Sequence, residues 1–284
     1  MQPPTHLAIS LDRPAGGNFS HFAHFVSDFL IPFFSLLRRT QREEYLVKGT
    51  PLSIELEDKF HFRIGPLFSV VREIFPNIQV DYVNKFTQPP LRLRRRPWEN
   101  SPEDIENFVD YLKNVLPLTP QKCGVVIVKR VLNREKYPVR GQFLTSGADR
   151  RLIETGFEKL VQRVMERRPD TVIVALETLT FAEQFSLFMQ ADTLIAQHGA
   201  AFVHGHWMPK GGHLIELHCA NRRLSPTMVP TIARLRTHKA SVVYYPCALR
   251  EGCLRMRIGD ATKVSRLLKM DSVSIQLPDA GKII

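Results

Sequence analysis

The stretch with the clearest chemical spacing lies at residues 191–218 and reads ADTLIAQHGAAFVHGHWMPKGGHLIELH. Two short apolar runs, 193–196 and 213–217, are typical of buried parallel strands. Between them, the loop at 198–201 has the sequence HGAA, whose small residues allow backbone N–H groups to approach a ligand. A short helix expected to start near Phe202 would point its positive end at an anion. This pattern predicts a phosphate site.

The second of these runs carries Glu216 near its end. In open α/β sheets, a carboxylate at the carboxyl end of a strand is often the group that holds ribose hydroxyls. A phosphate site and a ribose-binding carboxylate on adjacent strands predict a nucleotide site.

Several familiar nucleotide and metal motifs do not occur in the sequence, including Gly-x-Gly-x-x-Gly, the P-loop, Cys-x-x-Cys, His-Glu-x-x-His and Asp-x-Asp. A bound diphosphate would therefore be neutralised by protein cations and helix dipoles. Arg130 follows a predicted strand at 124–129, and Arg150 and Arg151 precede a predicted helix at 151–167. The alternative for each arginine is a solvated surface charge.

His204 and His206 follow His198 closely, but these spacings match no common zinc pattern, so we predict no metal site. Trp207 is expected to pack in the core or to stack on a uracil or sugar ring. A Pro- and Arg-rich stretch at 86–104 predicts an exposed irregular loop, and lining of an acceptor groove by its arginines and Trp98 is the alternative.

The first part of the chain predicts mixed helices and strands. Residues 17–39 indicate a buried helix interrupted at Pro32. Strands are expected at 45–47 and 52–56, followed by a short helix at 68–75. A further helix is expected to follow Ser101 as N-cap, with Pro102 at its first position and Asp104 close behind.

The second part alternates strands and helices regularly. Beyond the elements already named, strands are predicted at 171–175 and 242–245 and a helix at 181–190. Such alternation predicts βαβ units and a parallel sheet with helices on both faces, so the fold class is α/β. We expect an N-terminal domain at 1–117, a C-terminal Rossmann-like domain at 118–265, and a tail at 266–284 that packs back on the N-terminal domain.

The composition is that of a folded protein, with 44% hydrophobic and 24% charged residues. A net charge of +11 favours anionic partners, but without a recognition motif we predict no nucleic-acid partner. Neither a run long enough for a membrane span nor a signal peptide is present, so we expect a soluble protein, cytoplasmic as given or lumenal if it is part of a longer chain. Four cysteines are too few for a disulfide scaffold.

The order of these motifs resembles glycosyltransferase family 61. The matching features are His24-Phe25-x-x-Asp28, a strand-end Arg130, Arg150-Arg151-Leu152-Ile153, Phe181-x-x-Gln184 before the HGAA loop, and LIEL ending around Glu216. Two positions depart from the family pattern. Ala201 stands where Gly is usual, which tightens the loop, and Glu154 stands where Asn is usual, which weakens any polar contact assigned to that turn.

The resemblance implies a GT-B architecture, in which two Rossmann-like domains face a cleft with the donor in the C-terminal domain and the acceptor in the N-terminal one. It also implies an inverting, metal-independent transfer from a UDP-sugar to a glycan or glycoprotein acceptor, with no cofactor. The residues expected to bind the nucleotide sugar are Arg130, Arg150, Arg151, His198, Gly199, Ala200, Ala201 and Glu216.

An inverting transfer needs a base to accept the proton of the attacking hydroxyl. His24 and Asp28 are four residues apart and would share one helical face, so Asp28 is predicted to be the base or to orient His24. His21, one turn earlier, is a further candidate. The alternative is that both residues have purely structural roles.

The sequence thus predicts a glycosyltransferase that uses a UDP-sugar, with xylose favoured and N-acetylglucosamine as the alternative. A protein of the same fold that only binds glycans, and a basic nucleic-acid-binding protein, are the alternatives from other functional classes.

Overall fold

The computed structural model divides the chain into two compact units, Met1–Leu118 and Thr119–Ile284. The structure describes residues 5–11, 22–40, 42–46, 50–57, 67–93, 100–120, 123–129, 153–155, 157–219, 228–245, 254–255, 264 and 266–268. His21 and residues 269–284 of the predicted tail lie outside these ranges.

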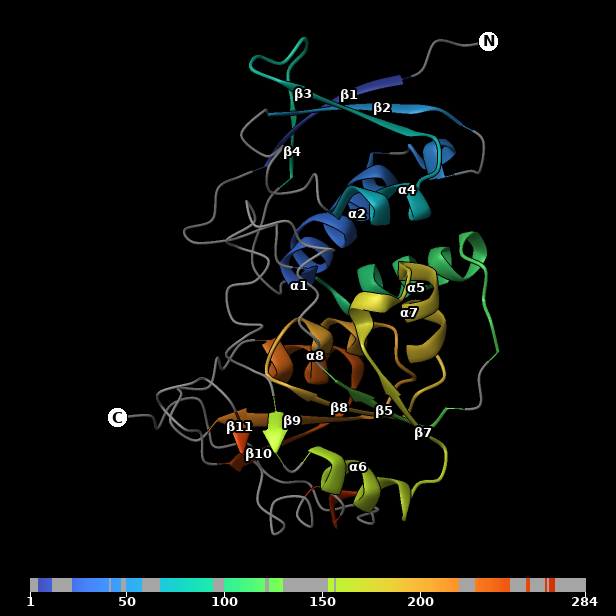
Figure 1. Ribbon diagram of the computed structural model, residues 1–284. Coiled ribbons are helices and arrows are strands. Elements are labelled where there is room, and N and C mark those ends of the chain that lie inside the picture. Colours follow the sequence, from blue (N-terminus) through green and yellow to red (C-terminus); the bar gives the residue numbers. More distant parts are fainter. Residues whose placement is uncertain are drawn as a thin grey trace. The chain divides into compact units, whose positions relative to one another are not determined.

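The first unit contains a four-stranded parallel sheet in the order β3-β2-β1-β4 (Figure 1). The strands are β1 (Thr5–Leu11), β2 (Leu52–Glu57), β3 (Ile78–Val83) and β4 (Leu91–Leu93). Only β2 was predicted. β4 lies within the stretch expected to be an irregular loop, and its pairing with β1 corrects that expectation.

Helices of the first unit pack below this sheet in the view of Figure 1. They are α1 (Phe22–Phe25), the π-helical η1 (Val26–Leu30), α2 (Ile31–Arg39), the 3-10 helix η2 (Glu43–Leu46), α4 (Phe68–Ile74) and α5 (Pro102–Val115). The predicted helix at 68–75 is confirmed. The expected strand at 45–47 is wrong, because the chain turns tightly after α2 and the Tyr45 N–H bonds the Arg42 carbonyl at 3.2 Å.

The helix that carries His24 and Asp28 is not interrupted at Pro32. A wide π-helical turn precedes the proline instead, and the N–H of Ile31 reaches back five residues to the carbonyl of Val26. Proline lacks an N–H and clashes with the carbonyl four residues earlier in a regular α-helix. The wider turn relieves this clash, so α1, η1 and α2 form one continuous buried helical segment.

Helix α5 begins as predicted. Ser101 is its N-cap, Pro102 stands at the first turn, and Ser101 and Asp104 form a capping box in which the Asp104 N–H donates to Ser101 Oγ at 3.0 Å. Arg39 of α2 also donates to both carboxylate oxygens of Asp104, at 2.9 and 3.1 Å. The cap thereby ties the start of α5 to α2.

Ser101→Ala is expected to lower the free energy of unfolding by about 1 kcal/mol, because it removes the acceptor for the Asp104 N–H. Chemical denaturation checks this result. Lys113→Ala on the exposed side of the same helix is the control and should change stability by less than about 0.5 kcal/mol. Equal effects of the two substitutions would contradict the role of the cap.

The second unit contains a five-stranded parallel sheet in the order β10-β9-β8-β5-β7. Its strands are β5 (Val125–Val128), β7 (Thr171–Val174), β8 (Thr193–Gln197), β9 (His213–Cys219) and β10 (Lys239–Tyr245). All five were predicted. A separate parallel pair joins β6 (Ile153–Thr155) to β11 (Leu254–Arg255).

Helices cover both faces of the five-stranded sheet, as the alternating pattern predicts (Figure 1). They are α6 (Phe157–Met165), the 3-10 helices η6 (Leu176–Thr178) and η7 (Ala200–His206), α7 (Phe181–Phe188) and α8 (Met228–Arg236). The helix expected at 151–167 is shorter than predicted, because residues 153–155 pair as β6. Helix α8 was not predicted.

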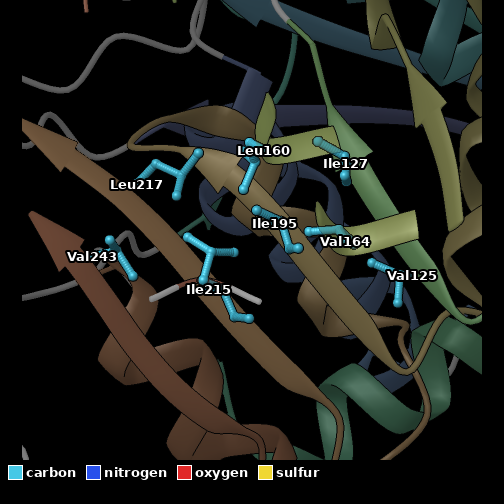
Figure 2. Close-up of a cluster of buried hydrophobic side chains, with 9 residues drawn as sticks. Val125, Ile127, Leu160, Val164, Ile195, Ile215, Leu217 and Val243 are labelled. Atoms are coloured by element: carbon cyan, nitrogen blue, oxygen red, sulfur yellow. The ribbon is translucent and has the colours of Figure 1, made fainter. Parts of the chain in front are cut away.

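One face of the sheet packs on α6 through a buried apolar cluster (Figure 2). Leu160 and Val164 of α6 meet Ile195 of β8 and Ile215 of β9. Since side chains alternate along a strand, the neighbouring residue Glu216 points to the other face, where Leu214 lies close to Gly205 of η7. This alternation places Glu216 on the same side of the sheet as η7.

Within the part of the chain that the structure describes, no helix has the length and apolarity required to span a bilayer.

Candidate functional site

The predicted phosphate loop lies at the carboxyl edge of the second sheet. Strand β8 ends at Gln197, and the backbone N–H of His198 then donates to the carbonyl of Leu217 in β9 at 3.1 Å. Gly199 follows with φ 153° and ψ −165°, a conformation that is essentially restricted to glycine. The sharp turn at Gly199 leads directly into η7, so the strand, the loop and the helix follow the predicted order.

The loop carries three successive backbone N–H groups that have no acceptor among the residues that the structure describes. Within the described residues, the N–H groups of Gly199, Ala200 and Ala201 make no hydrogen bond, and the first bond of η7 runs from the Phe202 N–H to the Gly199 carbonyl at 3.3 Å. Backbone donors of this kind are costly to leave unsatisfied away from water. Adjacent N–H groups on one turn form a concave anion site. The geometry can therefore hold a phosphate oxygen.

Glu216 lies beside this loop and is bonded by two histidines. His198 Nδ1 is 2.5 Å and His218 Nδ1 is 3.2 Å from the same oxygen, Glu216 Oε1. Glu216 is 2% exposed and the His198 side chain 24%, so His198 is the member of this pair that reaches solvent. Glu216 Oε2 has no hydrogen-bonding partner among the described residues.

Burial alone would raise the pKa of Glu216, but hydrogen bonds from His198 and His218 outweigh this effect and leave the pKa below its usual value. The carboxylate is therefore ionised at neutral pH. An ionised carboxylate accepts hydrogen bonds only, so each ring donates its Nδ1–H. The two histidines fix Glu216 with one oxygen left for a further hydroxyl donor.

His218 is a site residue that was not predicted from the sequence. The signal was present, because His218 lies two residues after Glu216 on β9 and side chains two apart on a strand share a face. The His198 and His218 rings meet edge to face with centroids 5.2 Å apart. His218 is thus a third member of the site, and the ligand atoms of His198, Glu216 and His218 lie within 4.8 Å of one another.

The first unit brings together the second predicted pair, His24 and Asp28. His24 Nδ1 lies 2.7 Å from Asp28 Oδ2. The Asp28 side chain is completely buried, whereas that of His24 is 29% exposed. Asp28 stands in the π-helical turn, a local geometry that recurs at functional sites. A partly exposed imidazole oriented by a buried carboxylate has the arrangement of a general base and its positioning partner.

His204, His206 and Trp207 lie in the core of the second unit rather than with His198. The His204 ring stacks on Phe188 at a centroid distance of 4.3 Å, and Trp207 packs edge-on against Phe181. All three are buried, so packing is their role in this structure. Burial lowers the pKa of both His204 and His206 to about 3.

The three predicted phosphate-binding arginines, Arg130, Arg150 and Arg151, lie outside the described residues, as do Arg94–96 and Trp98 of the Arg-rich stretch. Their roles remain predictions. Arg92 lies on β4 and is exposed.

Comparison with known proteins gives a match to a family profile and a shorter match to one mouse protein. Residues 22–215 match the sequence profile of the family described as Glycosyltransferase 61. The matched range is more than half of the chain and includes His24, Asp28 and the loop at 198–201. A shorter match of 36% identity over 72 residues links the chain to the mouse protein O-linked-mannose beta-1,4-N-acetylglucosaminyltransferase 2. That match covers 25% of this chain and 12% of the mouse protein.

Proposed function

Because the chain belongs to glycosyltransferase family 61, we propose that it is an inverting, metal-independent transferase that moves a sugar from a UDP-sugar to a glycan or glycoprotein acceptor. Family membership supports glycosyl transfer itself. The identity of the nucleotide and the course of the reaction are our proposals. The observation that supports them is the set of three N–H groups at 199–201 beside Glu216, which have no acceptor within the described part of the chain.

The loop at 198–201 and Glu216 are proposed to bind the nucleotide-sugar donor. In our proposal, the N–H groups of Gly199, Ala200 and Ala201 bind the diphosphate, with help from the exposed His198 ring. Glu216 Oε2 accepts a hydrogen bond from a ribose hydroxyl at the carboxyl end of β9. Arg130, Arg150 and Arg151 are proposed to supply the remaining positive charge.

The acceptor side uses His24 and Asp28. The acceptor hydroxyl oxygen attacks the anomeric carbon of the donor sugar while its proton passes to His24. As the new glycosidic bond forms, the bond from the anomeric carbon to the diphosphate breaks, and its electron pair leaves with the β-phosphate. Asp28, buried behind the ring at 2.7 Å, orients His24 and stabilises the imidazolium that forms.

We further propose that the two units form the domains of a GT-B architecture, with acceptor binding in the first and donor binding in the second. Each unit has the parallel sheet that such a domain needs. For the donor sugar, we retain xylose from the sequence analysis. N-acetylglucosamine is the second candidate, because the mouse relative carries that sugar in its name.

Thermal unfolding with UDP, GDP, UDP-xylose, UDP-N-acetylglucosamine and UDP-glucose, all with EDTA, tests the proposal. A ligand at 100 times its dissociation constant stabilises by about 2.7 kcal/mol, which raises the melting temperature by several degrees. We expect a shift with UDP and one UDP-sugar but not with GDP. No shift with any nucleotide would overturn the donor assignment and favour a protein that only binds glycans.

The alternative of a nucleic-acid-binding protein has its own signature. Such binding would be tight for unrelated oligonucleotides and would weaken steeply with salt, because charge neutralisation drives it. We expect no such behaviour at physiological salt.

Glu216→Gln is expected to weaken UDP binding about tenfold, because the neutral amide is a poorer acceptor for a ribose hydroxyl and loses its pairing with the histidines. Calorimetric titration with UDP measures the change. Glu166→Gln, at an exposed site in the same unit, is the control and should bind UDP like the unaltered protein. Unchanged UDP affinity in Glu216→Gln would show that this carboxylate does not contact the nucleotide.

A further inference from the structure

The cluster of His198, Glu216 and His218 contains more ligating groups than nucleotide binding requires. His218 is 3% exposed, and its ring meets the partly exposed His198 ring edge to face beside Glu216. Two imidazole nitrogens and one carboxylate oxygen converge within 4.8 Å of one another. Convergent side chains of these types are the donor set of a transition-metal site.

The chemistry of the donor set selects the kind of ion. Imidazole nitrogen suits Zn²⁺ and its neighbours Co²⁺, Ni²⁺ and Cu²⁺, whereas Mg²⁺ and Ca²⁺ prefer oxygen ligands. Two histidines and one glutamate supply three protein ligands and leave a fourth position open to water or another ligand. The side chain of Glu216 supplies a carboxylate oxygen, which is a common ligand of these ions beside imidazole nitrogen.

The geometry is close to what an ion of this size needs. In a tetrahedral Zn²⁺ site with bonds of about 2.0 Å, neighbouring ligand atoms are about 3.3 Å apart. His218 Nδ1 is already 3.2 Å from Glu216 Oε1, and His198 Nδ1 is at 2.5 Å. A small outward rotation of the partly exposed His198 ring would make room for the ion.

The scaffold holds two of the ligands firmly and leaves an entry path at the third. Glu216 and His218 are fixed by the pairing of β9 with both β8 and β10. His198 follows β8 at the edge of the sheet, and its backbone is anchored to Leu217. When an ion binds, it replaces the Nδ1 protons, and each neutral ring then carries its proton on Nε2.

We propose that His198, Glu216 and His218 form a binding site for Zn²⁺ and related divalent transition-metal ions. The site shares His198 and Glu216 with the proposed donor site, so a bound ion and a bound nucleotide are expected to compete for these side chains. The proposed transfer chemistry needs no metal, and ion binding is therefore measured without nucleotide.

Titration of the EDTA-treated and dialysed protein with Co²⁺ and Zn²⁺, in the absence of nucleotide, tests this site. We expect visible absorption bands from one tightly bound Co²⁺, displacement of Co²⁺ by Zn²⁺, and no displacement by excess Mg²⁺. Calorimetry gives the affinity for Zn²⁺. Absence of a Co²⁺ spectrum together with absence of Zn²⁺ heat would overturn the proposal.

Two histidines on the same strand provide a matched comparison. His218→Gln should weaken Zn²⁺ binding at least about 100-fold, because it removes a ligand rather than a supporting group. His213→Gln alters a histidine that bonds Ser241 Oγ at 2.8 Å instead, and should bind Zn²⁺ as before. His198→Gln, at the more exposed ligand, repeats the test if His218→Gln does not fold. Unchanged Zn²⁺ affinity in folded ligand variants would place the ion elsewhere.

Measurements on the unaltered protein separate this inference from the proposed function. His218→Gln does not serve this purpose, because His218 helps to fix Glu216, which is proposed to bind the ribose. Binding of Co²⁺ to the cluster without a thermal shift with UDP would support the metal site and overturn the proposed nucleotide site. A thermal shift with UDP without Co²⁺ binding would do the reverse.

Discussion

Asp28→Asn is expected to lower the rate of sugar transfer by about 10²- to 10⁴-fold while UDP binds as before. Asparagine keeps the size of the buried side chain but cannot balance the positive charge that His24 acquires on taking the hydroxyl proton. The 2.7 Å bond from His24 Nδ1 to Asp28 Oδ2 also fixes which ring nitrogen faces solvent, and an amide holds that orientation less strictly. The measurement is the rate of transfer with the UDP-sugar that stabilises the protein.

His24→Gln should cause a loss of similar size, and the double variant should be little worse than either single one, because two residues that act as a unit are not additive. Asp110→Asn is the matched control, since Asp110 lies in the same unit with a side chain 70% exposed. It should leave the rate unchanged. Full transfer activity in Asp28→Asn with normal UDP affinity would show that Asp28 and His24 take no part in the reaction and have a structural role only.

The second sheet could be predicted strand by strand because its central strands β5 and β8 are buried on both faces and helices separate the strands regularly. β5 is a continuous apolar run and β8 has the apolar centre Leu194–Ala196, and both have the short length of central parallel strands. The carboxyl edge, and with it the position of the HGAA loop and Glu216, followed from this regular alternation.

The first sheet was harder to predict, for physical reasons that differ between strands. β3, with the sequence IQVDYV, is an edge strand that is half exposed, so its polar residues weaken the apolar signal. β4 has three residues and exists because β1 offers it a partner, which local sequence does not reveal. The π-helical turn before Pro32 depends on packing of the whole helical segment rather than on the proline alone.

Site contacts between residues close in sequence could be predicted, whereas contacts between separate strands could not. The pairing of His24 with Asp28 is local, since four residues separate them on one helical face. The bond from His198 to Glu216 joins the end of β8 to β9. The βαβ pattern predicted that both residues lie at the same edge of the sheet, but it did not predict the bond itself. His218 was not predicted because it lies beyond the apolar run 213–217, whereas β9 extends to Cys219 and its alternation places Glu216 and His218 on one face.

Acidification from pH 7.5 to pH 5 is expected to destabilise the second unit through its buried histidines. Burial lowers the pKa of His204 and His206 to about 3, helped by the neighbouring charge of Arg236 for His206, against about 6.5 in an unfolded chain. Above pH 6.5 both states hold these rings neutral. Between pH 6.5 and 3 only the unfolded chain takes up the protons, so stability falls by up to about 1.4 kcal/mol per pH unit for each histidine.

At pH 5 this effect is about 2 kcal/mol for each histidine, or several degrees in melting temperature. Trp207, whose ring lies 5.0 Å from that of His204, reports unfolding of this region by fluorescence in a protein that carries Trp98→Phe. His204→Leu should reduce the loss between pH 7.5 and 5, even if it lowers stability at neutral pH. Phe188→Leu removes the ring that stacks on His204 without removing a titrating group, so it should lower stability at both pH values and keep the full acid-induced loss. The same acid-induced loss in His204→Leu as in Phe188→Leu would show that protonation of His204 does not contribute to unfolding of this core.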